Sequence, residues 1–177
     1  MNHKILARKR IFTGRAFDVE ELEVALPDGR QRNYDLVDHV DSVTIIPIAK
    51  NGEILFVEQF RVGSDEKLLE LPAGVMDDGE NPEVCAAREV REETGMAAGK
   101  LTLLGAVYLA PGYSNELNHI FLAENLTEDP LDQDDDEFLS LKSVAFQETE
   151  KLTAEGKLKD SKTIAALYFY RLFGQNR

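Results

Sequence analysis

The strands that the first half of this sequence predicts lie too close together for a parallel fold. Residues 43–48 form an apolar run of the buried-strand type, Asn51-Gly52 is a strong two-residue hairpin turn, and the next strand begins at Glu53. Two parallel strands need a crossover of a dozen or more residues between them. The spacing therefore excludes a simple βαβ series and predicts antiparallel hairpins.

Helices become frequent after residue 80. Asn81 can cap a helix that starts at Pro82 and ends at Gly95, and further helices are predicted over 147–155 and from Asp160 onward. The last one has an apolar stripe that we expect to face the core, formed by Ile164, Leu167, Tyr168 and Leu172. Segment 124–137, with eight acidic residues among fourteen, is predicted to be a loop. The pattern predicts an α+β fold, with a mixed β-sheet between helices and a β-rich segment before it.

The charge balance limits the classes of partner. Thirty-three acidic residues against twenty Lys and Arg give a formal charge of −13, which repels nucleic acid and anionic membranes. No apolar run approaches the roughly 20 residues of a membrane span. The single cysteine, Cys85, excludes an internal disulfide framework and suits a reducing compartment. We therefore expect a cytoplasmic protein with a small-molecule ligand, and a phosphate-bearing ligand would need metal cations as intermediaries.

Three glutamates share one face of the helix after Pro82. At about 100° per residue, Glu89, Glu92 and Glu93 fall within an arc of about 100°. Like charges at these spacings destabilise a helix, and the last turn favours cations. A hard divalent cation such as Mg²⁺ would stabilise the cluster. The alternative is a solvated surface on which Arg88 and Arg91 pair with these acids. The same geometry turns Val84, Ala87 and Val90 toward a core.

The complete spacing of this segment resembles the signature of the Nudix hydrolases. In that signature a glycine is followed after five residues by Glu and after seven more by Arg-Glu, an aliphatic residue, one residue, Glu-Glu, one residue, Gly and an aliphatic residue. Every defined position is filled here, by Gly74, Glu80, Arg88, Glu89, Val90, Glu92, Glu93, Gly95 and Met96. The resemblance implies the α/β/α sandwich of that family.

Roles within the motif follow from the resemblance. It implies that Glu89, Glu92 and Glu93 bind Mg²⁺ or Mn²⁺, with the carbonyl of Ala73 as an additional ligand. We count Glu92 and Glu93 among the catalytic residues as well.

Four other positions of the motif are structural by the same resemblance. Arg88 and Glu80 are expected to form an ion pair that braces the loop against the helix, which agrees with the tendency of an arginine flanked by acids to organise them. Gly74 would let the backbone pass close to the metal ions, and Gly95 would end the helix.

The resemblance implies hydrolysis of a nucleoside diphosphate linked to another group. A base must remove the proton of the attacking water, and related enzymes often take it from a loop outside the helix. By resemblance we favour Glu137 as this base, with Asp135 and Asp136 behind it. The alternative is that these residues form a solvated acidic turn.

Further positions resemble the ADP-ribose pyrophosphatase group of the family. Pro111 follows Met96 by fifteen residues, a spacing that marks this group. The segments 57–61 and 69–74 also resemble it, so Arg61 is expected to hold a phosphate or the terminal ribose, and Glu70 to accept hydroxyl hydrogen bonds or assist metal binding. Alternatively, Pro111 belongs to a simple turn, and Arg61 and Glu70 belong to an ion-pair network.

This group is typically homodimeric, with exchanged N-terminal strands. We therefore divide the chain into residues 1–42, which form a β-rich segment used in dimerisation, and residues 43–177, the Nudix hydrolase domain. Phe17 or Tyr34 could stack on the adenine base, or be ordinary strand residues.

Two other functions remain open at this point. One is hydrolysis of GDP-mannose or another nucleoside diphosphate sugar. The other is a catalytically inactive Nudix domain that senses a nucleotide, although the intact glutamate set and the net charge argue against it.

Overall fold

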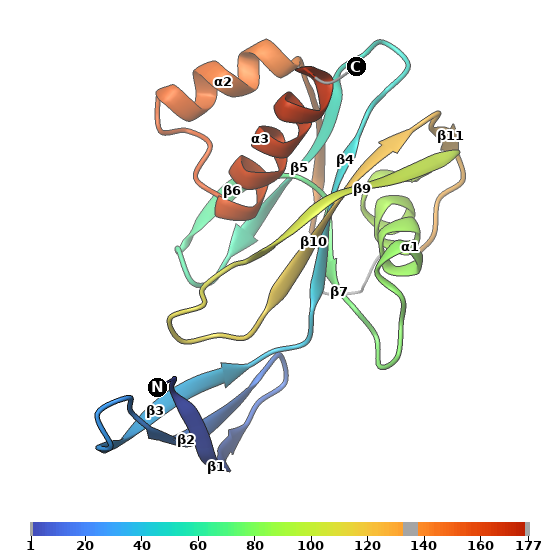
Figure 1. Ribbon diagram of the computed structural model, residues 1–177. Helices are drawn as coiled ribbons and strands as arrows, with labels where there is room; N and C mark the ends of the chain where they lie inside the picture. Colours follow the sequence, from blue (N-terminus) through green and yellow to red (C-terminus); the bar gives the residue numbers. More distant parts are fainter. Residues whose placement is uncertain (1, 133–137, 176–177) are drawn as a thin grey trace. The chain divides into compact units, whose positions relative to one another are not determined.

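The computed structural model describes residues 2–132 and 138–175 and divides them into two compact units. Unit 1 contains residues up to 41 together with 108–117, and unit 2 contains 42–107 and 118 onward. Residues 108–117 group with the N-terminal unit, and the use of residues 1–42 in dimerisation stays a prediction. Figure 1 shows the elements of each unit.

Unit 1 is a three-stranded antiparallel sheet in the order β1-β2-β3. The strands are β1 (Lys4–Thr13), β2 (Asp18–Ala25) and β3 (Gln31–Asp38). Gly29, with φ of 87°, closes the turn between β2 and β3. On β2 buried and half-buried positions alternate, whereas all ten residues of β1 are exposed. Apolar side chains of β1 (Ile5, Leu6, Ile11, Phe12) and also Phe17 and Tyr34 are therefore in contact with solvent in this chain.

The turn 108–117 joins unit 1 through backbone pairing with the end of β3. The amide of Val37 donates to the carbonyl of Tyr113 over 2.7 Å, and the amide of His39 donates to Oδ1 of Asn115 over 2.9 Å. Pro111 lies in this turn and is exposed. A segment distant in sequence thus completes the unit.

Unit 2 contains a four-stranded mixed sheet in the order β7-β4-β10-β9. Its strands are β7 (Ala73–Val75), β4 (Ser42–Pro47), β10 (Leu117–Glu124) and β9 (Lys100–Tyr108), and β4 and β10 are parallel. A second, antiparallel sheet has the order β12-β5-β6, with β12 (Ser140–Val144), β5 (Ile54–Arg61) and β6 (Glu66–Glu70). Two short strands, β8 (Met96–Ala97) and β11 (Thr127–Glu128), pair with each other. The segment predicted as one loop therefore contains a strand.

Helices cover both faces of the mixed sheet. Helix α1 (Pro82–Thr94) packs on one face, with Val90 against Val43 and Phe121 in one core cluster. On the opposite side lie α2 (Phe146–Ala154) and α3 (Ser161–Gln175), and a second cluster joins Leu167 to Ile120 (Figure 1). The predicted α+β class, with a mixed sheet between helices, is confirmed.

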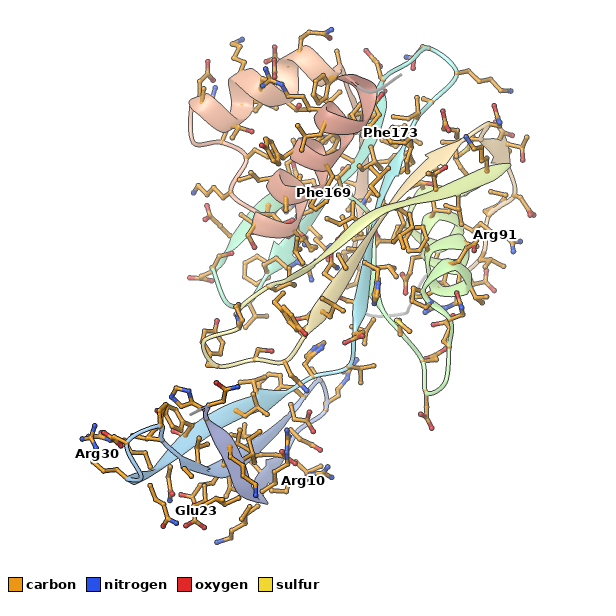
Figure 2. All side chains as sticks on the ribbon, in the orientation of Figure 1. Arg10, Glu23, Arg30, Arg91, Phe169 and Phe173 are labelled. Atoms are coloured by element: carbon orange, nitrogen blue, oxygen red, sulfur yellow. The ribbon has the colours of Figure 1, made fainter. Side chains whose placement is uncertain are left out.

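The predicted apolar stripe of α3 is wrong except for Leu167. Ile164, Tyr168 and Leu172 are exposed, and the buried face instead contains Thr163 and Ala166. Apolar residues occur on every side of this helix, so their period does not identify a single face. Phe169 contacts the sheet where Gly105 leaves room for its ring, since a Cβ there would lie 2.5 Å from the ring (Figure 2).

Candidate functional site

Helix α1 begins and ends at the residues that the sequence predicts. The Asn81 side chain accepts from the amide of Glu83 over 2.9 Å, and Pro82 occupies the first helical position. Gly95, with φ of 72°, ends the helix and donates to the carbonyl of Arg91. These caps determine which side chains of α1 face the sheet.

The buried face of α1 carries two of the three glutamates. Glu89 and Glu93 are 8% and 3% exposed, and they lie on the same face as Val90, whereas Val84 is 58% exposed. The predicted orientation of Val84 toward the core is therefore wrong. Buried carboxylates are costly unless they are hydrogen-bonded or bound to cations. Because Glu89 and Glu93 are buried, they do not belong to a solvated surface, which was the alternative interpretation of these residues.

Gly74 lies directly against Glu89. A Cβ built on Gly74 would be 1.9 Å from both Cδ and Oε1 of Glu89, so any other residue there would force Glu89 or the backbone to move. The neighbouring Ala73 amide donates to Oε2 of Glu93 over 3.2 Å. Strand β7 thus brings its backbone within contact distance of the α1 carboxylates, and Glu89 keeps this position only with glycine at 74.

Arg88 is the centre of the charged cluster. Its Nη2 donates to Glu80 over 3.0 Å, and its Nη1 donates to Glu89 over 2.6 Å and to Glu92 over 2.9 Å. A further bond from Nη2 to the carbonyl of Val75 joins the helix to the end of β7, on the other side of the loop that contains Glu80. Arg88 and Glu80 thus form an ion pair across this loop.

The ion pair changes the titration of both partners. The Arg88 guanidinium beside Glu80 lowers the pKa of that carboxyl below its ordinary value, and the hydrogen bond with Glu80 raises the pKa of Arg88. Both groups therefore stay charged across the physiological range.

The donor set suits a hard divalent cation. Arg88 supplies one positive charge against three contacting carboxylates, and Glu93 adds a fourth carboxylate nearby. Carboxylate oxygens and backbone carbonyls are the ligands that Mg²⁺ prefers. Among residues 2–132 and 138–175, however, no three His, Cys, Asp or Glu side chains converge on one point. Glu89 and Glu92 turn toward Arg88, and Glu93 turns toward the Ala73 amide, so their metal binding stays a prediction.

Arg61 and Glu70 form a two-point ion pair at the ends of β5 and β6. The Arg61 Nε and Nη2 atoms donate to Oε1 and Oε2 of Glu70 over 2.8 and 2.6 Å. Lys162 of α3 also donates to Oε2 of Glu70, a contact that sequence reasoning missed. The ion-pair alternative thus describes the Glu70 contacts, and the role of Arg61 toward a substrate stays a prediction.

Three other predicted site features have different outcomes. Glu137, with Asp135 and Asp136, lies outside the described residues. Pro111 belongs to unit 1, whereas the α1 cluster belongs to unit 2. Cys85 is buried, and desolvation raises its pKa to about 12, which agrees with its interpretation as a helix residue rather than a nucleophile.

A family comparison agrees with the motif and the fold. The NUDIX domain family matches residues 38–167. The chain belongs to the Nudix family. Nudix hydrolases generally use divalent metal ions, and the glutamates on α1 supply carboxylate oxygens, which such ions bind.

Similar proteins cover almost the whole length of this Nudix chain. It is 36% identical over 174 residues to an ADP-ribose pyrophosphatase of Bacillus subtilis (strain 168), covering 97% of this chain and 94% of that one. It is 32% identical over 171 residues to a methanol dehydrogenase activator of Bacillus methanolicus, covering 96% and 92%. A crystal structure of an ADP compounds hydrolase superposes with a TM-score of 0.88 at 24% identity, covering 99% and 96%, which shows the shared fold.

No described helix has the length and the apolar content needed to cross a membrane.

Proposed function

We propose that this protein hydrolyses the pyrophosphate bond of ADP-ribose or a related nucleoside diphosphate sugar, giving AMP and a sugar phosphate. The observation that carries the proposal is the pair of buried glutamates, Glu89 beside Gly74 and Glu93 beside the amide of Ala73. The similarity to the Bacillus subtilis ADP-ribose pyrophosphatase over nearly the whole chain supports this substrate class.

Glu89, Glu92 and Glu93, with the carbonyl of Ala73, would hold the divalent cation, which we expect to be Mg²⁺ or Mn²⁺. The chemistry that the bound cation supplies is neutralisation of the diphosphate charge and a lower pKa for the attacking water. Arg88 keeps Glu89 and Glu92 on one side of the helix, and Glu80 fixes Arg88 to the loop. Gly74 keeps the space beside Glu89 open.

The substrate contacts complete the proposal. Arg61 retains N–H donors beyond the two used by Glu70, and we assign them to a phosphate oxygen of the substrate. Glu137 would take the proton of the water as the new P–O bond forms and the bridging P–O bond breaks. Pro111 would belong to the loop that recognises the substrate. The chain is expected to act as a cytoplasmic homodimer without nucleic-acid or membrane partners.

The test is hydrolysis of a panel of nucleoside diphosphate sugars, including ADP-ribose and GDP-mannose, with Mg²⁺ or Mn²⁺. We expect ADP-ribose to give AMP and a sugar phosphate, and excess chelator to abolish turnover until metal is restored. A preference for GDP-mannose would move the proposal to the alternative substrate, and no turnover of any member would refute it.

A matched pair of variants tests the assignment of the site. Glu93→Gln removes one charge from the buried face of α1, and Glu83→Gln removes one from its exposed first turn. Glu93→Gln should lower kcat by about 10²-fold or more, which corresponds to about 3 kcal/mol of barrier, and Glu83→Gln should leave kcat unchanged. Near wild-type kcat for Glu93→Gln would show that these glutamates are not the catalytic site.

A further inference from the structure

Glu70 is a buried carboxylate that two cations hold from different parts of the chain. Its side chain is 1% exposed, and it accepts from Arg61 of β5 and from Lys162 in the first turn of α3. Lys162 also pairs with Asp160 over 3.0 Å. A buried charge is stable only when its partners are in place, so these four groups form one charged network.

The two cations of this network differ in exposure. The side chain of Arg61 is 41% exposed, whereas that of Lys162 is 12% exposed. Of these two cations, only the Arg61 side chain therefore presents substantial surface to a ligand. The hydrogen bonds with Glu70 are the main cause that raises the pKa of Arg61, and the charges of Asp160 and Glu93 raise it further, so Arg61 interacts electrostatically with Glu93 of α1.

We propose that Lys162 is a positioning residue that acts through Glu70 to keep Arg61 available to the diphosphate of the substrate. With Lys162 present, two cations balance Glu70 and Asp160. Without it, Arg61 alone faces both carboxylates, which hold it more tightly and reduce its attraction for phosphate oxygens. This inference rests on the proposed function, in which Arg61 contacts the substrate.

A matched pair of lysines separates this role from a general loss of charge. Lys159 lies three residues earlier and pairs over 2.9 Å with Glu66, whose side chain is 42% exposed. We expect Lys162→Met to raise the KM for ADP-ribose about tenfold while kcat changes less than about twofold, because a binding contact is weakened and the α1 cluster is unaltered. Lys159→Met should change neither constant, and Lys162→Arg should recover most of the KM.

Two further variants test whether Lys162 acts on Arg61 through Glu70 and whether its effect is electrostatic. In a Glu70→Gln background, adding Lys162→Met should raise KM by much less than tenfold. Asp160→Asn keeps a side chain able to accept from the amide of Thr163, a bond of 2.9 Å here, but it removes a negative charge. It should lower KM rather than raise it, and it remains informative if Lys162→Met fails to fold.

The outcomes separate this inference from the proposed function. If the wild type hydrolyses ADP-ribose but Lys162→Met and Lys159→Met share the wild-type KM, Lys162 is only structural and the inference is refuted. A full tenfold effect in the Glu70→Gln background, or a raised KM for Asp160→Asn, also refutes it. If the wild type hydrolyses no nucleoside diphosphate sugar, the proposed function fails, and this inference fails with it.

Discussion

Replacing Gly74 with alanine should disable the site without unfolding the chain. The added carbon would lie 1.9 Å from Cδ and Oε1 of Glu89, and real Cβ contacts are essentially never shorter than 3.0 Å. Glu89 or the backbone of β7 must therefore move by at least about 1.1 Å. A misplacement of about 1 Å at a reacting centre costs on the order of 10²-fold in rate, so we expect kcat to fall by about that factor.

The effect on stability should be much smaller. The atoms in the way are the far end of a flexible side chain, and their displacement sacrifices mainly the 2.6 Å contact between Arg88 and Glu89. One charged hydrogen bond of about 1.5–3 kcal/mol corresponds to a drop in Tm of roughly 3–12 °C for a domain of this size. The folded variant should also need more Mg²⁺ to reach half-maximal rate.

The measurements are kcat against Mg²⁺ concentration and thermal melts in chelator. Gly174→Ala is the control, because a Cβ there meets nothing within 4 Å and alanine favours the helix. It should keep wild-type kcat. A kcat within threefold of wild type for Gly74→Ala would mean that the position of Glu89 does not control the chemistry, and the reasoning about this site would be wrong.

Three further outcomes are expected. Glu80→Gln should lower Tm with a smaller loss of kcat than Glu93→Gln. Because folding lowers the pKa of Glu80, its carboxylate stabilises the fold above the ordinary pKa of 4.5, and this stabilisation is lost as the pH falls. The Tm of the variant should therefore fall less on acidification than the Tm of the wild type. Sedimentation at micromolar concentration should give about twice the 19.8 kDa chain mass, and a fully active monomer would contradict the exchanged-strand arrangement. Cys85, with a pKa of about 12, should resist iodoacetamide at pH 8 in the native chain and react once the chain is denatured, and rapid native alkylation would contradict its burial.

Local signals in the sequence were sufficient for α1 but not for the orientation of its faces. Asn81, Pro82 and Gly95 specify the ends of the helix through contacts within a few residues. Its buried face contains Glu89 and Glu93 rather than Val84, since the backbone beside Gly74 leaves space for a carboxylate. Hydrophobic periodicity assumes that apolar residues face inward, and this assumption fails on α1, where two charged residues take up the buried face.

Contacts between distant segments were beyond sequence reasoning. Lys162 follows Glu70 by 92 positions, so no spacing rule connects them. The pairing of β11 with β8 joins strands of two residues each, which are too short to show an alternating pattern. On α3 the apolar residues surround the helix, and only the packed structure shows that Ala166 is buried and Tyr168 is exposed.

The attachment of residues 108–117 to the end of β3 has a consequence for chimaeric proteins. The partners of this turn are Val37 in β3 and His39 directly after that strand, and the family match starts at residue 38, after most of β3. A chain shortened to residues 38–167 would keep the turn but lose most of β3, the strand to which the turn is hydrogen-bonded. It would also end in the middle of α3. Exchanging only the N-terminal strands for those of a relative would place the 108–117 turn of this chain against strands that it does not match. The N-terminal strands and residues 108–117 form one structural unit, and a chimaera should transfer both together.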